Sequence, residues 1–328
     1  MADLRHSPAP DAARAWYRRA LVAGVVLALT VVVLGAYVRL SDAGLGCPDW
    51  PGCYGHLVLP DAAEARDSAQ ARFPERPIEA GKAWREMIHR YLATTLGLCI
   101  IGVVVAAWLN RRDPAQPRAV PAALLAVVCF QGLLGMWTVT LLLKPLIVMG
   151  HLLGGLTTLA ILAWLLLDDL RRREGPTIAT PAWPALVGLA VLAGQIALGG
   201  WTSSNYAALA CPDVPTCQGQ WWPEEANFGE GFVLWRGLGI NYEFGVLDAP
   251  SRVAIHFVHR LGAVTTLAVL LAVAAYYRRA AWPAVVRTAA LLVAGAVVLQ
   301  VAIGVGIVWF GLPLPLATSH NAVAAVLL

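Results

Sequence analysis

Two pairs of histidines at matching positions in the two halves of the chain are the residues best suited to chemistry. His89 and His259 each stand directly before an arginine, and His151 and His320 follow them at nearly the same separation. All four lie in or beside apolar segments, where an ionisable side chain is costly and therefore indicates function. Two imidazoles that face each other across a helical bundle suit the axial positions of a heme iron. Zinc would need four tight ligands, or three and a water molecule, so the pairs favour heme.

An internal repeat supports this interpretation, because a lone histidine in a span could simply bond to another helix. LGAYVRLSDAGLGCPDWPGC, from Leu34, aligns with LGGWTSSNYAALACPDVPTC, from Leu198, at an offset of 164 residues. An offset of 170 relates the two His–Arg pairs, and one of 169 relates His151 to His320, Gln131 to Gln300 and Gly135 to Gly304. Such periodicity indicates duplication of a four-helix unit. Both units begin on the same side, so the repeats are parallel.

In each half, the residue three positions before the first histidine and the arginine directly after it are further candidates for chemistry. Glu86 stands three residues before His89 and therefore shares its helix face. A carboxylate there could relay protons or stabilise a cationic intermediate, or it could lie at the interface and meet water. His256 occupies this position in the second half, where it could tune a heme or act as an alternative ligand. Arg90 and Arg260 could each hold a heme propionate or extend toward lipid headgroups.

The elements that must position these residues are membrane-spanning helices. The chain is 59% hydrophobic and 13% charged, whereas soluble domains carry about 25% charged residues. Spans of about 20 apolar residues are expected at 20–40, 84–108, 119–142, 145–168, 182–202, 252–277, 283–311 and 316–328, the last of which is short. We therefore predict an all-α polytopic membrane protein with eight transmembrane helices in two pseudo-symmetric four-helix bundles, formed by residues 1–174 and 175–328.

The distribution of arginines predicts the orientation of these spans. Arginines flank the apolar segments on one side, which is therefore cytoplasmic: Arg14, Arg18, Arg19, Arg111, Arg112, Arg118, Arg171, Arg172, Arg173, Arg278, Arg279 and Arg287. The polar segments 41–83 and 203–250 then lie on the outer side of a bacterial inner membrane, and the histidine pairs lie toward that side. These short basic clusters are orientation signals, and nothing in the sequence indicates a nucleic-acid-binding groove.

Each outer segment contains a cysteine pair, in CPDWPGC (Cys47 and Cys53) and in CPDVPTC (Cys211 and Cys217). This spacing could close a disulfide if the Cα atoms come within about 7 Å, and the outer side is oxidising. A redox-active thiol pair that passes electrons is the alternative. The segment that follows the second pair is rich in tryptophan, and we expect its indoles at the membrane interface.

Taken together, these motifs resemble the heme A synthase family over nearly the whole chain. The resemblance rests on two four-span halves, EMIHR at Glu86–Arg90, a histidine that opens the fourth span, a second His–Arg at His259–Arg260 and the paired cysteines. It implies oxidation of the C8 methyl of heme O to a formyl group, which gives heme A for cytochrome oxidase.

The resemblance also assigns roles to particular residues. It implies that Glu86, His89 and His151 serve the substrate heme, and that His259 and His320 hold a heme b cofactor. It further implies the disulfides Cys47–Cys53 and Cys211–Cys217. Heme O and membrane lipid are the expected partners, with heme O synthase and an electron donor as further candidates.

Two other functions are compatible with parts of the pattern. A membrane electron carrier with two bis-histidine hemes of b type would use the four histidines but leaves Glu86 without a role. The parallel repeat also permits a transporter. Transporters usually interrupt their helices at the midplane, whereas the polar residues here lie near one surface, so a transporter is disfavoured.

Overall fold

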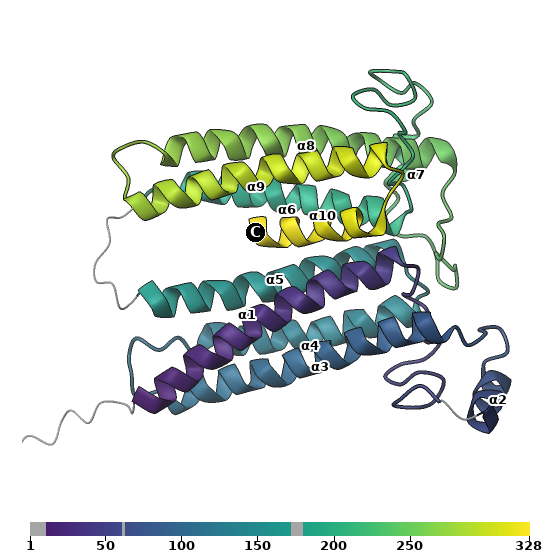
Figure 1. Cartoon of the computed structure of the whole chain (residues 1–328), viewed down its shortest axis with the longest axis horizontal. Helices are drawn as coiled ribbons and strands as arrows, with labels where there is room; N and C mark the ends of the chain where they lie inside the picture. Colours follow the sequence, from purple (N-terminus) through teal and green to yellow (C-terminus); the bar gives the residue numbers. More distant parts are fainter. Residues whose placement is uncertain (1–10, 61–62, 172–179) are drawn as a thin grey trace, which may run out of the picture.

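The computed structural model describes residues 11–60, 63–171 and 180–328, and every regular element in these ranges is a helix (Figure 1). The expected all-α class is therefore confirmed for this part of the chain. The expected domain boundary at 174/175 lies outside the described residues, as do Arg172 and Arg173. The helices are α1 (Asp11–Leu40), α2 (Ala63–Arg72), α3 (Ala80–Leu109), α4 (Ala119–Thr140), α5 (Pro145–Arg171), α6 (Trp183–Ser204), α7 (Phe228–Gly231), α8 (Ala249–Tyr277), α9 (Ala284–Trp309) and α10 (Leu314–Leu327).

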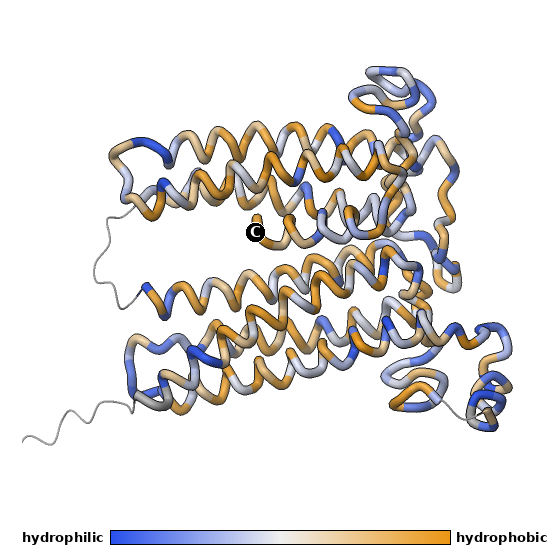
Figure 2. The backbone as a smooth tube through the Cα atoms, viewed as in Figure 1, coloured by the Kyte–Doolittle hydropathy of each residue, from blue (hydrophilic) through white to orange (hydrophobic). Residues whose placement is uncertain are grey.

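Seven of these helices are long and apolar enough to cross a bilayer, namely α1, α3, α4, α5, α6, α8 and α9. Figure 2 shows apolar residues running along the whole bundle, with polar residues collected in the connecting segments. The helix α10 has 14 residues, which at 1.5 Å per residue span about 21 Å, less than the hydrocarbon thickness of about 30 Å. The protein is thus an integral membrane protein with seven spans by length and composition. The segment expected as an eighth span is a shorter apolar helix.

The two halves share one hydrophobic core. Leu21, Ile100 and Leu162 of the first half belong to the same buried cluster as Leu270 and Val297 of the second. Within the halves, α1 packs against α3 and α5, and α8 packs against α6 and α9. Between the halves, α1 contacts α10 and α5 contacts α6. The first and last helices of the halves therefore form the joint between them.

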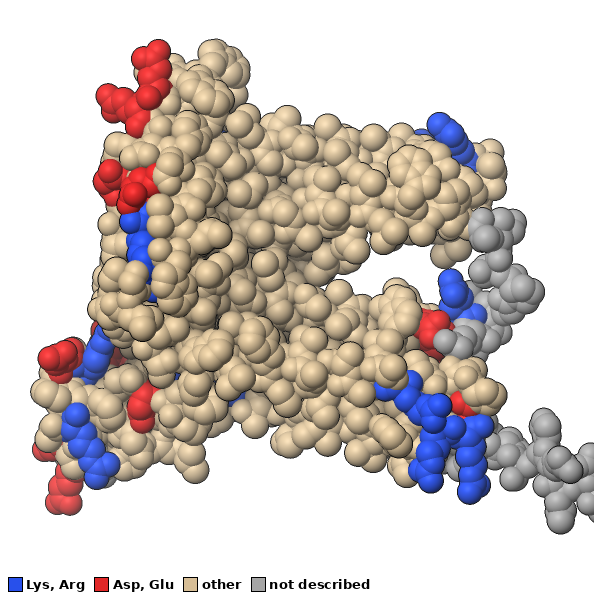
Figure 3. Space-filling model, turned by 180° about the vertical axis from the view of Figure 1, so that it is seen from behind, with Lys and Arg blue, Asp and Glu red and all other residues tan. Residues whose placement is uncertain are grey.

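Segments 41–60, 63–79 and 205–248, with the short helices α2 and α7, lie at the same end of the bundle, here called the loop end (Figure 1). The arginine-flanked helix ends lie at the opposite end. Figure 3 shows blue side chains gathered there, while most of the acidic side chains visible on this face lie at the loop end. Charge is therefore distributed asymmetrically along the bundle, as the sequence predicted.

Two basic side chains of the first half bind the second loop segment, residues 205–248. The Lys144 ammonium, buried between α4 and α5, donates to the carbonyl of Arg236 at 2.7 Å and to that of Gly237. It also lies 4.1 Å from the centre of the Trp235 ring. Arg76 forms a 2.8 Å ion pair with Glu243. We call these contacts of Lys144 and Arg76 the clasp, because they join loop segments that are far apart in the sequence.

Candidate functional site

Each of the four histidines lies near the loop end of a different helix. His89 is on α3, His151 on α5, His259 on α8 and His320 on α10, and all four side chains are half-buried. His89 and His151 lie on α3 and α5, which both pack against α1, and His259 and His320 lie on α8 and α10, which both pack against α9. The structure therefore brings together the two pairs that the sequence predicted, one in each half.

A glycine on a neighbouring helix faces each histidine ring. A Cβ atom added at Gly35 of α1 would lie only 2.9 Å from Cε1 of His89, and one at Gly199 of α6 would lie 3.2 Å from Cε1 of His259. Gly135 of α4 faces His151 in the same way at 3.4 Å, and Gly304 of α9 faces His320 at 3.2 Å. Any side chain at Gly35, Gly199 or Gly304 would press on the imidazole. The glycines leave each ring room to lie against a helix backbone.

The imidazole nitrogens have few protein partners. Among the described residues, Nε2 of these four histidines makes no hydrogen bond, and Nδ1 of His89, His151 and His320 is buried with no partner. An axial heme ligand uses one ring nitrogen for iron and offers the other to a hydrogen-bond acceptor. Paired imidazoles with free nitrogens, each beside a glycine, fit an axially ligated heme in each half. Within the same ranges, no group of three or more His, Cys, Asp or Glu is placed to hold a metal ion.

Both cysteine pairs form disulfides at the loop end. The Cα atoms are 4.8 Å apart in Cys47–Cys53 and 4.6 Å apart in Cys211–Cys217. Each disulfide closes a loop with the same internal framework. The carboxylate of Asp49 accepts from the backbone N–H groups of Tyr54 and Gly55 at 2.7 and 2.8 Å. The repeat therefore predicts that a second aspartate accepts the same backbone hydrogen bonds in the loop of the other half.

Asp213 is that second aspartate, at the offset of 164 from Asp49. Its carboxylate accepts from the backbone N–H groups of Gln218 and Gly219 at 2.6 and 3.0 Å. The hydroxyl of Thr216 also donates to it, and these donors hold the pKa of Asp213 below its usual range. In both disulfide loops, therefore, an aspartate carboxylate holds the shape of the loop by accepting hydrogen bonds from backbone N–H groups.

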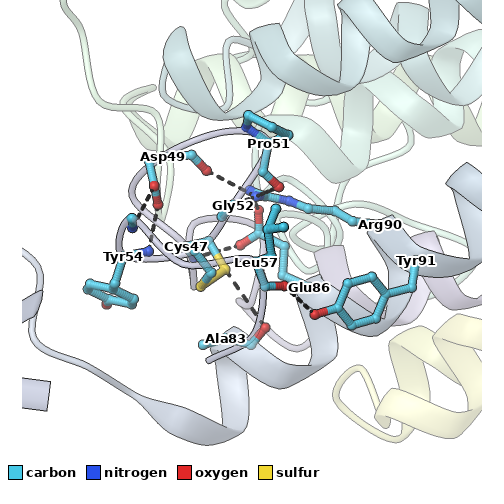
Figure 4. Close-up of a disulfide and its surroundings, with 12 residues drawn as sticks. Cys47, Asp49, Pro51, Gly52, Tyr54, Leu57, Ala83, Glu86, Arg90 and Tyr91 are labelled. Atoms are coloured by element: carbon cyan, nitrogen blue, oxygen red, sulfur yellow. Dashed lines mark hydrogen bonds and ion pairs between the residues drawn. A yellow bond between two sulfur atoms is a disulfide. The ribbon is translucent and has the colours of Figure 1, made fainter. Parts of the chain in front are cut away.

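Glu86 and Arg90 attach the first disulfide loop to α3 (Figure 4). The backbone N–H of Cys47 donates to Oε2 of Glu86 at 2.8 Å, while Arg90 pairs with Oε1 at 2.5 Å. Arg90 also donates to the carbonyls of Asp49 at 3.0 Å, Pro51 at 3.2 Å and Gly52. The Glu86 side chain is only 6% exposed. A buried carboxylate–guanidinium pair therefore lies one turn of α3 from His89.

His256 and Arg260 attach the second loop to α8 in the same manner. The backbone N–H of Cys211 donates to Nδ1 of His256 at 3.1 Å, and Arg260 contacts Nε2 of His256 at 3.3 Å. Arg260 donates to the carbonyls of Cys211, Asp213 and Thr216 at 2.6, 2.6 and 2.8 Å. The two halves thus use one architecture in which a carboxylate is exchanged for an imidazole.

Comparison with known proteins agrees with this geometry. A family model described as cytochrome oxidase assembly protein matches residues 18–328. A heme A synthase from Shewanella oneidensis is 46% identical over 308 residues, which cover 93% of this chain and 91% of that protein. The chain belongs to the heme A synthase family. More distant heme A synthases also match over most of both chains. One from Caulobacter vibrioides is 31% identical over 94% of this chain and 91% of its own length. One from Rhizorhabdus wittichii is 29% identical over 98% and 92%.

Two features of this family member go beyond what the sequence predicted. Arg90 and Arg260 bind backbone carbonyls of the disulfide loops, and their assignment to heme propionates remains a prediction. Gln195 of α6 is a site residue that the sequence reasoning missed. Its amide nitrogen lies 3.1 Å from Nδ1 and 3.0 Å from the backbone oxygen of His259. The signal was present, because Gln195 precedes Gly199 by four residues, as Gln131 precedes Gly135.

Proposed function

We propose that this protein is a heme A synthase, an integral membrane oxidoreductase that converts heme O into heme A for cytochrome oxidase. The observation that carries the proposal is the duplicated histidine pair, in which Nε2 of every ring is free of partners within the described part of the chain. The relative from Shewanella oneidensis, which is named a heme A synthase, supports it over almost the whole chain. The asymmetry between Glu86 and His256 supports an enzyme with one reacting site and one cofactor site.

The proposed division of labour follows the repeat. Residues 1–174 form the substrate half, in which His89 and His151 bind heme O. Residues 175–328 form the cofactor half, in which His259 and His320 bind heme b. Together the halves make two pseudo-symmetric four-helix bundles, with α10 as the eighth membrane helix. The matching attachments of the two disulfide loops support this pseudo-symmetry.

With oxygen from O2, conversion of a methyl group to a formyl group is R–CH3 + 2O2 + 4H⁺ + 4e⁻ → R–CHO + 3H2O, and the proposed electron donor supplies the four electrons. With oxygen from water the conversion is R–CH3 + H2O → R–CHO + 4H⁺ + 4e⁻, and an electron acceptor takes the place of the donor. Bound heme b supplies one-electron transfer to this chemistry. The chain itself must orient the substrate and move protons. Glu86 is the buried carboxylate nearest to His89 along α3, and it is the proposed proton carrier. Arg90 is paired with Glu86 and keeps that carboxylate beside the site. A further part of the proposal is that Arg90, like Arg260, contacts a heme propionate.

The membrane determines access to the site. Heme O carries an apolar tail, which we place among the lipid-facing helices, so that the substrate enters laterally from the bilayer. The arginine-rich end faces the cytoplasm of a bacterial inner membrane, and the heme sites lie toward the outer side. Heme O synthase and an electron donor are the proposed protein partners.

The test is to purify the protein from cells that supply heme O, extract the hemes and separate them by chromatography. Heme A is expected from the wild type, and heme O or a hydroxylated intermediate from Glu86→Gln, with heme A formation lowered at least about 100-fold. Glutamine keeps one acceptor, for Cys47, but loses the pairing of the second oxygen with Arg90. An unchanged melting temperature of the variant would therefore assign the loss of heme A to proton transfer, and a lowered one to loop attachment. Glu79→Gln, an exposed acid just before α3, is the matched control. Heme b alone in every preparation would indicate the electron carrier instead.

A further inference from the structure

A glutamine four residues before the histidine-facing glycine occurs on three of the four helices that carry such a glycine. The pairs are Gln131–Gly135 on α4, Gln195–Gly199 on α6 and Gln300–Gly304 on α9. Four residues are about one helical turn, so both side-chain positions share a face. In each case the amide nitrogen donates to the backbone carbonyl of the histidine that the glycine faces, at 2.8 Å for His151, 3.0 Å for His259 and 3.0 Å for His320.

The exception is α1, whose Gly35 faces His89. The offset of 164 that relates Gly35 to Gly199 also relates Val31 to Gln195. Valine has no hydrogen-bonding group, and Nδ1 of His89 is buried without a partner. Among the described residues, His89 is the one histidine of the four whose backbone carbonyl receives no hydrogen bond from a glutamine.

Atoms without partners point to what the glutamines do when heme binds. Oε1 of Gln131, Gln195 and Gln300 is buried and accepts no hydrogen bond. Nδ1 of His151 and His320 is also buried without a partner. An imidazole that binds iron presents its second nitrogen as an N–H donor, and an acceptor for that donor fixes the ring. Unpaired acceptors thus occur on all three glutamines, and two of them, Gln131 and Gln300, contact histidines whose Nδ1 is also unpaired. The third, Gln195, already lies 3.1 Å from Nδ1 of His259 through its amide nitrogen.

We propose that the three glutamines are positioning residues for heme-ligating histidines and that Val31 makes His89 the exchangeable ligand. The inference rests on the proposed function and deepens it. In the cofactor half, both histidines have a glutamine, so the heme is retained. In the substrate half, only His151 has one, so a substrate can bind and leave through the His89 side.

The experiment replaces Gln195 by valine and Val31 by glutamine, and it measures the rate at which heme leaves the protein. Protein is loaded with heme b, and transfer of that heme to apomyoglobin is followed by absorbance. A His89→Ala background isolates the cofactor half, and a His259→Ala background isolates the substrate half. Gln195→Val is expected to accelerate release from the cofactor half at least about tenfold, and Val31→Gln to slow release from the substrate half about tenfold, as for other ligand-orienting residues. Gln195→Val should also shift the midpoint potential of the bound heme.

Matched controls separate positioning from general damage. Val31→Leu changes the size of the same side chain without adding an amide and should leave heme release unchanged. Gln195→Asn keeps the amide but shortens its reach, and it provides the test if Gln195→Val does not fold. Wild-type release rates in both Gln195 variants, or equal slowing by Val31→Leu and Val31→Gln, would overturn the proposal. Because these rates use heme b alone, a failure to form heme A would overturn the proposed function and leave this result standing.

Discussion

At the scale of single residues, Arg90 and Arg260 show how one side chain can organise a whole loop. Each guanidinium carries five N–H donors in a rigid fork, and each collects three backbone carbonyls of its disulfide loop. Lysine has the charge without the fork. The arginines therefore fix the loop over the end of the histidine-bearing helix.

Arg90→Lys is accordingly expected to destabilise the protein although the charge is kept. Carbonyls left without a donor cost about 1–3 kcal/mol, which should appear as a lower melting temperature in detergent and faster proteolysis of residues 47–59. Arg85→Lys is the control, because Arg85 donates one 3.3 Å hydrogen bond, to the carbonyl of Ser41, and lies 6.0 Å from the centre of the Tyr37 ring. This variant should change stability by less than about 0.5 kcal/mol. Equal melting temperatures for Arg90→Lys and the wild type would contradict this account.

The histidines were predictable from the sequence and the contacts of the arginines were not. An ionisable residue in an apolar span is conspicuous, and its recurrence in a repeat singles it out. Every residue has a backbone carbonyl, so the sequence does not indicate which carbonyls an arginine will bind. The partners of Arg90 are set by how residues 47–53 fold. Gln195 was missed for a related reason, since a glutamine inside a span indicates a polar contact without saying which atom it meets.

At the scale of elements, hydropathy predicted the long helices because burial in lipid dictates both their length and their composition. The short helices α2 and α7 lie in polar segments and depend on local contacts. Asn227, for example, caps α7 by accepting from the backbone N–H of Glu230 at 3.0 Å. The clasp was equally invisible, because it joins the connection before α5 to a loop of the other half.

Lys144→Met tests the clasp. Methionine preserves the length of the side chain but leaves the carbonyl of Gly237 without its donor and that of Arg236 with only the Tyr242 hydroxyl at 3.2 Å. It also removes the cation–π contact with Trp235. The loss of two hydrogen bonds, about 1–3 kcal/mol, should accelerate backbone hydrogen exchange in residues 232–248 about tenfold or more. Lys82→Met removes an exposed ion pair with Glu79 and should leave exchange in that segment unchanged. Unaltered exchange in Lys144→Met would show that the loop is held by other contacts.

At the scale of the whole molecule, two similar halves are joined through their first and last helices and share one core. The repeat predicted the content of each half but not this joint, because internal similarity carries no information about how copies meet. Contacts of α1 with α10 and of α5 with α6 place elements of the two proposed heme sites in one packed unit. That arrangement suits electron transfer between a substrate half and a cofactor half.

The most direct test of this division is to compare the hemes retained by His89→Ala and His259→Ala, extracted and separated by chromatography after expression with heme O. We predict that His89→Ala keeps heme b and forms no heme A, and that His259→Ala loses heme b. Full heme b in His259→Ala together with its loss in His89→Ala would reverse the assignment. Wild-type heme content in both variants would show that these histidines are not the ligands.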